Sequence, residues 1–245
     1  MIDLHCHLLP SIDDGASNMK ESLALARIAS ANGIKKSIVT PHIQPGRFDN
    51  DINSISVAFI EFQQALKENH ILLQVGMAAE VRICPEIMLM ITNNLIPFLG
   101  NLDGYNILLL EMPYNHIPLG SDKMVRWLIN RKIRPIIAHP ERNAEIVTNI
   151  EKIYPFIELG CLLQITAGSL LGRFGHQQQL CAQQLLENEL VDVIATDAHN
   201  LKYRPPNLEQ GRKAAAEIIG ETAAWKLVHD TPEQIISSQS RVWFQ

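Results

Sequence analysis

The sequence predicts an α/β fold of seven strand–helix units, in which the strands form a parallel sheet and the helices surround it. Short runs rich in β-branched residues alternate with longer amphipathic segments along the chain, and this alternation is typical of βα repeats. The chain has 245 residues, 47% of them hydrophobic, and barrels of about 200–250 residues often fold as one unit. Because no Pro/Ser-rich linker interrupts the pattern, we predict a single domain over residues 1–245.

The expected strands are short, and longer helices follow them. The first strand, Ile2 to His5, leads to a helix that is capped by Asn18, with Glu21 three residues on, and that ends near Gly33. The other expected strands span residues 37–40, 71–75, 107–110, 135–138, 162–165 and 191–195. Helices are expected at 52–69, 121–131, 176–189 and 207–219, with two more that start near residues 221 and 231.

Two architectures accommodate seven parallel strands, an open doubly wound sheet and a closed barrel. No GxGxxG or GKS/GKT phosphate-binding motif occurs in the sequence, which weakens the nucleotide-binding version of the open sheet. The pattern of strands and helices alone leaves both architectures open.

Composition and charge exclude several classes of partner. The net charge of −5 gives no general attraction to nucleic acid or to an anionic membrane. The MIDLHCHL start has no signal-peptide features, and no apolar run approaches the roughly 20 residues of a membrane helix. The four cysteines form no CxxC pair and are typical of reduced thiols. We therefore expect a cytoplasmic protein without nucleic-acid binding or membrane insertion; the sequence gives no argument about its oligomeric state.

Metal-ligand residue types follow nearly every expected strand. They are His5, His7, His42, Glu80, Glu111, His139, Asp197 and His199. Because the active site of a βα barrel lies at the carboxyl ends of its strands, these groups are expected to converge. Strand side chains two residues apart point the same way, so each HxH or DxH pair can hold one ion or two neighbouring ions. The sixth strand contributes only Gln164 and Thr166.

The chemistry of this set favours transition metals. Imidazole nitrogens with carboxylate oxygens suit Zn, Mn or Fe better than calcium, which prefers oxygen ligands alone. Carboxylates drawn into one pocket repel one another and shift toward protonation, and divalent cations remove that penalty. The remaining histidines are interpreted differently: His70, His176 and His229 as ordinary surface or core residues, while His116 stays unassigned.

Three arginines lie just beyond ligand residues, in loops on the same face. Arg142 is three residues after His139, and Arg204 is five residues after His199. Guanidinium groups bind phosphate oxygens in a bidentate manner, which favours a phosphate-binding role for both. Arg47 fits a phosphate contact and an ordinary loop residue equally well.

A series of motifs runs in order through nearly the whole chain. It comprises Met1–Pro10, residues 13–15, Thr40–His42 with Gly46, Glu80, Glu111–Pro113, His139–Arg142, Gln164–Leu170, Gly172–Gly175, Thr196–Asn200 and Arg204–Pro206. This series resembles the PHP-type, manganese-dependent bacterial protein-tyrosine phosphatases, which are associated with capsule and exopolysaccharide synthesis. The resemblance implies a distorted seven-stranded, TIM-like βα barrel with a trinuclear metal centre.

The resemblance also implies which residues hold each ion. The first set is His5, His7, Glu80 and Asp197; the second is Glu80, Glu111 and His139; the third is Asp14, His42 and His199. Asp14 enters through the resemblance alone, since spacing leaves it a turn residue. By similarity, Arg142 and Arg204 bind the phosphate.

The cofactor and partner implied by the resemblance are Mn²⁺, with up to three ions, and a phosphotyrosine protein. Zn, Fe and Mg are the alternative metals, and a tyrosine-autophosphorylating kinase of polysaccharide export is the expected partner. One departure concerns substrate preference. Where the family often carries another His or basic residue after His42, this chain has Ile43 and Gln44, and Arg47 is the candidate for the missing charge.

The expected reaction is hydrolysis of a phosphomonoester by a metal-bridged hydroxide that attacks phosphorus in line. Alternatives remain at this level. A small-molecule phosphatase of the histidinol-phosphate type uses similar ligands, whereas an HxH-barrel nuclease needs a basic groove of which the charge balance gives no sign. An amidohydrolase often has a lysine where Glu111 stands, and a non-catalytic binding protein need not keep a full ligand set.

Overall fold

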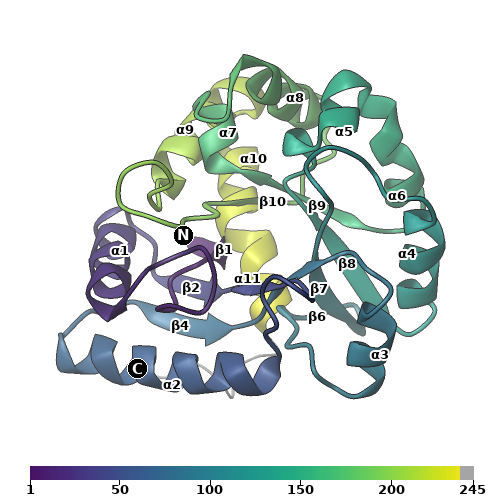
Figure 1. Ribbon diagram of the computed structural model, residues 1–245. Coiled ribbons are helices and arrows are strands. Elements are labelled where there is room, and N and C mark those ends of the chain that lie inside the picture. Colours follow the sequence, from purple (N-terminus) through teal and green to yellow (C-terminus); the bar gives the residue numbers. More distant parts are fainter. Residues whose placement is uncertain (238–245) are drawn as a thin grey trace.

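A computed structural model describes residues 1–237 and confirms the predicted α/β class. The strands lie inside and the helices surround them (Figure 1). The predicted domain runs to Gln245, so residues 238–245 lie outside the described part and the single domain stays a prediction. Among residues 1–237, no helix has both the length and the apolar character that a membrane crossing requires.

The strands form two parallel sheets. The first has the order β1 (Ile2–Cys6), β2 (Lys36–Val39), β4 (Gln74–Met77). The second has the order β10 (Val193–Ala195), β9 (Leu162–Thr166), β8 (Ile133–Ala138), β7 (Tyr105–Glu111), β5 (Glu80–Arg82), β3 (His42–Ile43). A short strand, β6 (Gly100–Leu102), pairs antiparallel with β7.

The two sheets are joined on both sides. Strand β2 runs on into β3 and β4 into β5, each after a break of two residues. On the other side, the Asp197 N–H donates to His5 O at 2.7 Å and the His7 N–H donates to Ala198 O at 2.8 Å, next to an isolated parallel bridge between Cys6 and Ala198. If β2 with β3 and β4 with β5 are each counted as one strand, seven strands are hydrogen-bonded side by side in a ring. Between β10 and β1, an isolated bridge takes the place of a regular ladder. The closed barrel stays a prediction, which this pairing supports.

The helices lie largely where they were expected. The longer ones are α1 (Met19–Ala31), α2 (Ile52–Glu68), α4 (Ser121–Ile129), α8 (His176–Glu187) and α9 (Leu208–Ile219). The shorter ones are α3 (Ile87–Thr92), α5 (Ala144–Thr148), α6 (Tyr154–Glu158), α7 (Ala167–Leu170), α10 (Glu221–Trp225) and α11 (Thr231–Ile236). As predicted, the Asn18 side chain caps α1 by accepting from the Glu21 N–H at 3.1 Å.

Two strands begin later than the sequence predicts: the expected strand 191–195 is observed as β10 from Val193, and the strand before β5 starts three residues late. The expected strand 71–75 is observed as β4 from Gln74, because the chain leaves α2 through a left-handed residue, His70, with φ of 53°. The Ile71 N–H still bonds back to Leu66 O at 3.0 Å, so residues 71–73 are used to turn away from the helix. Leu73 is buried but Leu72 is 90% exposed, so the apolar run that suggested a strand here reflects neither pairing nor continuous burial.

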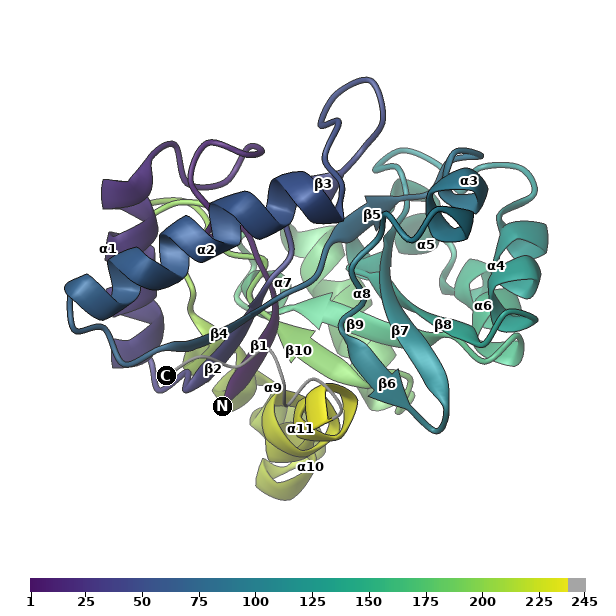
Figure 2. The same cartoon turned by 90° about the horizontal axis from the view of Figure 1, so that it is seen from below.

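The interior of the strand ring holds a compact apolar cluster. Residues from β7, β8 and β10 alternate between this cluster and the larger core beneath the helices: Ile107 and Leu109 face inward, whereas Leu108 and Leu110 face the helices. At the amino end of the strands, Ile235 and Ile236 of α11 complete the cluster, and Figure 2 shows this helix below the strands. At the carboxyl end, the inward face of β7 continues to Glu111. The polar site therefore lies at the end of the ring opposite α11.

Candidate metal centre

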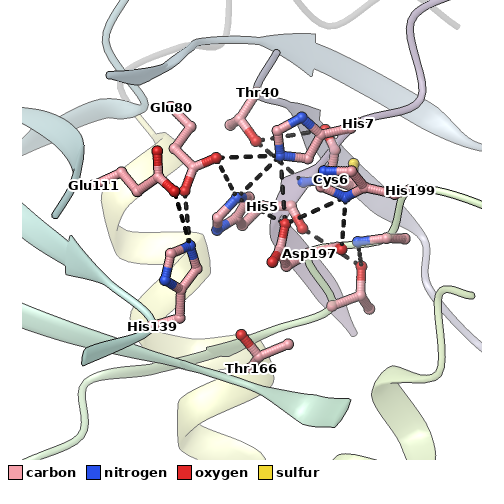
Figure 3. Close-up of polar contacts among 12 residues, drawn as sticks. His5, Cys6, His7, Thr40, Glu80, Glu111, His139, Thr166, Asp197 and His199 are labelled. Atoms are coloured by element: carbon pink, nitrogen blue, oxygen red, sulfur yellow. Dashed lines mark hydrogen bonds and ion pairs between the residues drawn. The ribbon is translucent and has the colours of Figure 1, made fainter. Parts of the chain in front are cut away.

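The nine predicted ligands lie together at the carboxyl ends of the strands. Figure 3 shows seven of them, namely His5, His7, Glu80, Glu111, His139, Asp197 and His199. His5, His42, Glu80 and Glu111 belong to β1, β3, β5 and β7, and the others follow strand ends in adjoining loops. Eight of the nine residues are buried, and Asp14 is the partly exposed one. The convergence predicted from strand-end positions is therefore present in the structure.

Four ligand atoms form a compact cage. His5 Nε2 lies 3.2 Å from His7 Nε2, 3.3 Å from Glu80 Oε2 and 3.2 Å from Asp197 Oδ1. His7 Nε2 lies 3.3 Å from the same glutamate oxygen and 3.4 Å from the same aspartate oxygen. Ligand atoms held about 2.0–2.1 Å from one ion in tetrahedral geometry lie roughly 3.4 Å apart. These four atoms match the first set implied by the resemblance and fit one metal ion.

A second group adjoins the first. Asp14 Oδ1 lies 3.3 Å from His42 Nε2 and 3.4 Å from His199 Nε2, and His7 belongs to the same group. This is the third predicted set, with His7 added. Because His7 belongs to both groups, it lies between the two candidate ion positions.

A third group differs from the predicted set in one residue. Ligand atoms of His42, Glu80 and Glu111 lie within 4.8 Å of one another, whereas the resemblance implies His139 in place of His42. His139 nevertheless faces both carboxylates, with Nε2 2.8 Å from Glu80 Oε1 and 4.0 Å from Glu111 Oε1. His139 follows the inward-facing Ala138, and its left-handed backbone, with φ of 34°, returns the ring toward the site.

Several buried ligand atoms lack hydrogen bonds. Glu80 Oε2, Asp197 Oδ1, His42 Nδ1 and His199 Nε2 are within 3.5 Å of other ligand atoms but form no hydrogen bond with any residue in 1–237. Buried polar atoms are normally hydrogen-bonded, so a group of unsatisfied atoms requires another partner. Divalent cations are the partner that this donor set fits.

Electrostatics point the same way. Burial, with the charge of Glu80 beside it, raises the pKa of Glu111 to about 7. For His42, burial opposes protonation, but Glu80 and Asp14 outweigh it and raise the pKa to about 9. Burial lowers the pKa of His199 to about 4. Among the four carboxylate ligands, only Glu111 shows the predicted shift toward protonation, because neighbouring histidines and arginines lower the pKa values of Glu80, Asp14 and Asp197. Bound metal ions would favour the charged form of Glu111 as well.

Residues beyond the predicted ligands complete the site. Asp13 accepts from His7, Gln164 bonds to His5 Nδ1 at 2.8 Å, and the Arg82 Nε–H donates to Glu111 Oε2 at 2.8 Å. At the closure of the ring, Asp3 accepts from the Thr196 N–H at 2.9 Å, next to Asp197. Sequence reasoning missed these roles. Gln164 carried a signal as a buried polar residue near the end of a strand, and Asp13 as the neighbour of Asp14.

Both predicted phosphate arginines reach the site, where they pair with Asp197. Arg142 Nη1 and Arg204 Nη2 donate to the same Asp197 oxygen, Oδ2. The ring of Phe174 lies against both guanidinium groups, 4.4 Å from Arg142 Cζ and 5.9 Å from Arg204 Cζ. Arg204 Nε is buried without a hydrogen bond to any described residue. Both arginines thus border the cage and keep further N–H groups for a ligand.

Arg47 lies at the edge of the site. Its side chain is 58% exposed, and Nη2 is 3.7 Å from Asp14 Oδ2. The guanidinium lies over the Phe48 ring, which stacks on the ligand His42 with centroids 5.4 Å apart. Arg47 therefore borders the outermost group of ligands, and its phosphate contact stays a prediction.

Known proteins with similar sequences share one activity in their names. The chain is 37% identical to the tyrosine-protein phosphatase YwqE of Bacillus subtilis over 240 residues, which is 98% of this chain and 93% of the relative. It is 29% identical to the tyrosine-protein phosphatase CpsB of Streptococcus pneumoniae, covering 98% of this chain and 99% of that protein.

Solved structures give the same relationship as the sequence comparisons. One from the crystal structures of YwqE from Bacillus subtilis and CpsB from Streptococcus pneumoniae, described as unique metal-dependent tyrosine phosphatases, matches with a TM-score of 0.90 and 32% identity. The match covers 97% of this chain and 95% of that one. The lactonase Lmo2620 from Listeria monocytogenes matches with a TM-score of 0.56 and 12% identity, over 97% of this chain and 94% of the lactonase chain. At this identity, the match shows a similar fold alone. A family model described as capsular polysaccharide synthesis, CpsB/CapC, matches residues 1–237, and the chain belongs to this family.

Proposed function

We propose that this chain is a metal-dependent phosphoric monoester hydrolase that acts as a protein-tyrosine phosphatase. The observation that carries the proposal is the cage of His5, His7, Glu80 and Asp197 with two arginines on its border. Such a site offers ligands for cations and guanidinium groups for phosphate oxygens. Membership of the CpsB/CapC family and the names of the relatives favour this function over a histidinol-phosphate-type phosphatase or an HxH-barrel nuclease.

The chain's own residues account for substrate positioning. Arg142 and Arg204, held by Asp197 and backed by Phe174, would bind the phosphoryl oxygens and stabilise the charge that develops on them. Bound divalent metals would supply a nucleophilic water of lowered pKa and neutralise negative charge. A tyrosyl leaving group has a pKa near ~10, so it needs less help from a general acid than an alkyl ester does.

Cys6, the cysteine next to the ligands, is excluded as a nucleophile by its surroundings. Cys6 lies between two ligands, but it is fully buried, and burial raises the pKa of its thiol well above the usual range. Its Sγ donates to Ile38 O at 3.4 Å, away from the cage. The Cys6 thiol therefore packs in the core and does not face the ligands.

The finer assignments belong to the same proposal. We assign Mn²⁺ as the metal, with up to three ions and with Zn, Fe or Mg as alternatives, since imidazole and carboxylate ligands suit this class. The substrate is a phosphotyrosine protein, for which a tyrosine kinase of polysaccharide export is our candidate. The four free cysteines agree with a cytoplasmic location, where thiols stay reduced.

Hydrolysis of a phosphotyrosine peptide by the full-length protein tests this function. The protein is assayed as purified, after chelation and after Mn²⁺ is added back, with histidinol phosphate as a parallel substrate. We expect chelation to abolish hydrolysis and Mn²⁺ to restore it on the peptide, with weak activity on the small ester. Activity on the small ester alone would keep the metal centre but reject the protein substrate.

A further inference from the structure

Two adjacent carboxylates in the loop after β1 face different partners. Asp14 faces the ligands His42 and His199, whereas Asp13 turns toward the back of His7. Asp13 Oδ2 accepts from His7 Nδ1 at 2.7 Å and from the backbone N–H of His42 at 3.0 Å, and Oδ1 accepts from the Gly15 N–H at 2.9 Å. The Asp13 side chain is 1% exposed. Its oxygens are thus occupied by protein donors and do not face the cage.

We propose that Asp13 is a positioning residue of the metal centre, which fixes the His7 ring and ties it to His42. An ionised carboxylate can only accept hydrogen bonds, so the proton of a neutral His7 must be on Nδ1 and the free lone pair on Nε2. Nε2 is the His7 atom in the cage, 3.3 Å from Glu80 Oε2 and 3.4 Å from Asp197 Oδ1. A carboxylate behind a metal-bound imidazole fixes its orientation and raises its basicity as a ligand.

The contact with Asp13 matters because its partner is His7. His7 belongs to two of the three ligand groups, so its orientation affects both. The bond from the His42 N–H to the same Asp13 oxygen holds a second member of the outer group. One buried carboxylate therefore links His7 with His42.

Gly15 permits the close approach that this arrangement requires. A Cβ at residue 15 would lie 2.3 Å from His7 O and 2.6 Å from His7 Cβ, so any other residue would push the loop away from His7. The Ala16 N–H also donates to His7 O at 3.2 Å. Each residue of the Asp13–Gly15 triplet thus has its own role. Asp13 orients the His7 ring, Asp14 faces the ligands His42 and His199, and Gly15 lets the loop lie close to His7.

His5 has a different partner. Its Nδ1 bonds to Oε1 of Gln164 at 2.8 Å, and this amide carries no charge. Asp13 therefore supplies the charged contact behind the HxH pair. The variant Asp13→Asn tests the charge at nearly constant shape, and Asp13→Ala removes the contact.

The experiment measures metal binding, so it does not depend on phosphatase activity, although it rests on the metal centre proposed above. Full-length wild type, Asp13→Ala and Asp13→Asn are stripped of metal and titrated with Mn²⁺ against a chelating indicator. We expect affinity to fall by about 10–100-fold in Asp13→Ala, with Asp13→Asn in between. Asp192→Asn is the matched control, since Asp192 Oδ2 accepts from the Leu163 N–H at 2.9 Å at the amino end of β9, away from the site. The Mn²⁺ affinity of this variant should equal that of the wild type.

A second readout separates positioning from simple destabilisation. With diamagnetic Zn²⁺ bound in place of Mn²⁺, ¹⁵N NMR of the wild type should find the His7 proton on Nδ1, and Asp13→Ala should lose this preference while its far-UV circular dichroism stays unchanged. Wild-type affinity in Asp13→Ala, or a His7 of the Zn²⁺-loaded wild type with its proton on Nε2 and not on Nδ1, would overturn the proposal. Weakened metal binding together with a wild type that cannot hydrolyse phosphotyrosine would support Asp13 and reject the phosphatase.

Discussion

Arg142 and Arg204 share a single carboxylate oxygen, Asp197 Oδ2, while the other oxygen of Asp197 faces the cage. This arrangement would couple the proposed phosphate binding to the proposed metal site, because the same side chain contacts both arginines and the cage. It also explains why two arginines more than 60 positions apart in the sequence meet at one point: they follow β8 and β10, and Asp197 lies between them.

Replacing either arginine by lysine should therefore impair catalysis. Arg142→Lys and Arg204→Lys keep a positive charge but lose the planar fork, so kcat/KM for a phosphotyrosine peptide should fall by about 10²–10³. Metal content, measured in parallel, should stay near wild type because the cage residues are unchanged. Arg27→Ala, a surface change at a residue that bonds Asn69, serves as the control. An unchanged kcat/KM in both variants would remove the arginines from substrate binding.

Glu80 and Glu111 should differ in their effect on metal binding. Glu80 belongs to two ligand groups and also bonds to His139, whereas Glu111 belongs to one group. Glu80→Gln should therefore lower the number of bound Mn²⁺ ions per chain more than Glu111→Gln does. Elemental analysis after equilibrium dialysis measures this number, and equal losses in the two variants would contradict the shared position of Glu80.

Residues differ in how well the sequence alone identified them. Ligand types such as His139 and Asp197 stood out because charged and imidazole side chains are uncommon where buried strands end. Asp13 and Gln164 did not, because their roles depend on which ligand the folded chain brings to their side. His42 was placed with one ion by resemblance, yet it also faces Glu80 and Glu111, a contact that depends on ring orientation.

At the scale of elements, the longer helices and the buried strands were predictable, whereas the broken strands were not. Strands β3 and β5 have two and three residues, too few for a periodic pattern, and they exist because β2 and β4 bend into the second sheet. These bends matter for the site, since β3 carries His42 and β5 carries Glu80. Their position was predictable from ligand types, but their pairing was not.

Helix α9 packs against α7 at a point where a side chain does not fit. A Cβ on Gly211 would lie 2.4 Å from Ala167 Cβ and 2.8 Å from Ala167 Cα. Gly211→Ala should therefore destabilise the fold by about 1–3 kcal/mol through overpacking, even though alanine is the better helix former by about 1 kcal/mol. Chemical denaturation measures the change. Glu217→Ala, at an exposed position of α9, should stay within about 0.5 kcal/mol of wild type.

A gain of stability in Gly211→Ala would show that α9 can move away from α7. That result would matter for the site, because Ser169 of α7 and Thr166 before it donate to the buried Glu141, at 2.7 and 2.9 Å, between His139 and Arg142. The packing of α9 thus supports the loop that carries His139 and Arg142, for which we propose metal and phosphate binding.

At the scale of the whole molecule, the ligands extend from His5 to His199 and so include residues from most of the strand ring. The two ends of this ring, β1 and β10, are also connected near the site, where Asp3 of β1 accepts from the Thr196 N–H and the Asp197 N–H donates to His5 O. The proposed metal ligands and the contacts between β1 and β10 therefore involve neighbouring residues, and we expect metal binding and folding to be thermodynamically linked.

This linkage predicts that Mn²⁺ stabilises the whole protein. At a free concentration of 100 times Kd, each site that forms only in the folded state adds about 2.7 kcal/mol to the free energy of unfolding. For a domain of this size, that corresponds to a rise in melting temperature of roughly 5–10 °C. Calorimetry of the metal-free and Mn²⁺-loaded protein should show one cooperative transition that moves upward, as expected for a single domain over residues 1–245. Two transitions, of which one responds to Mn²⁺, would instead divide the chain into separate units and confine the metal centre to one of them.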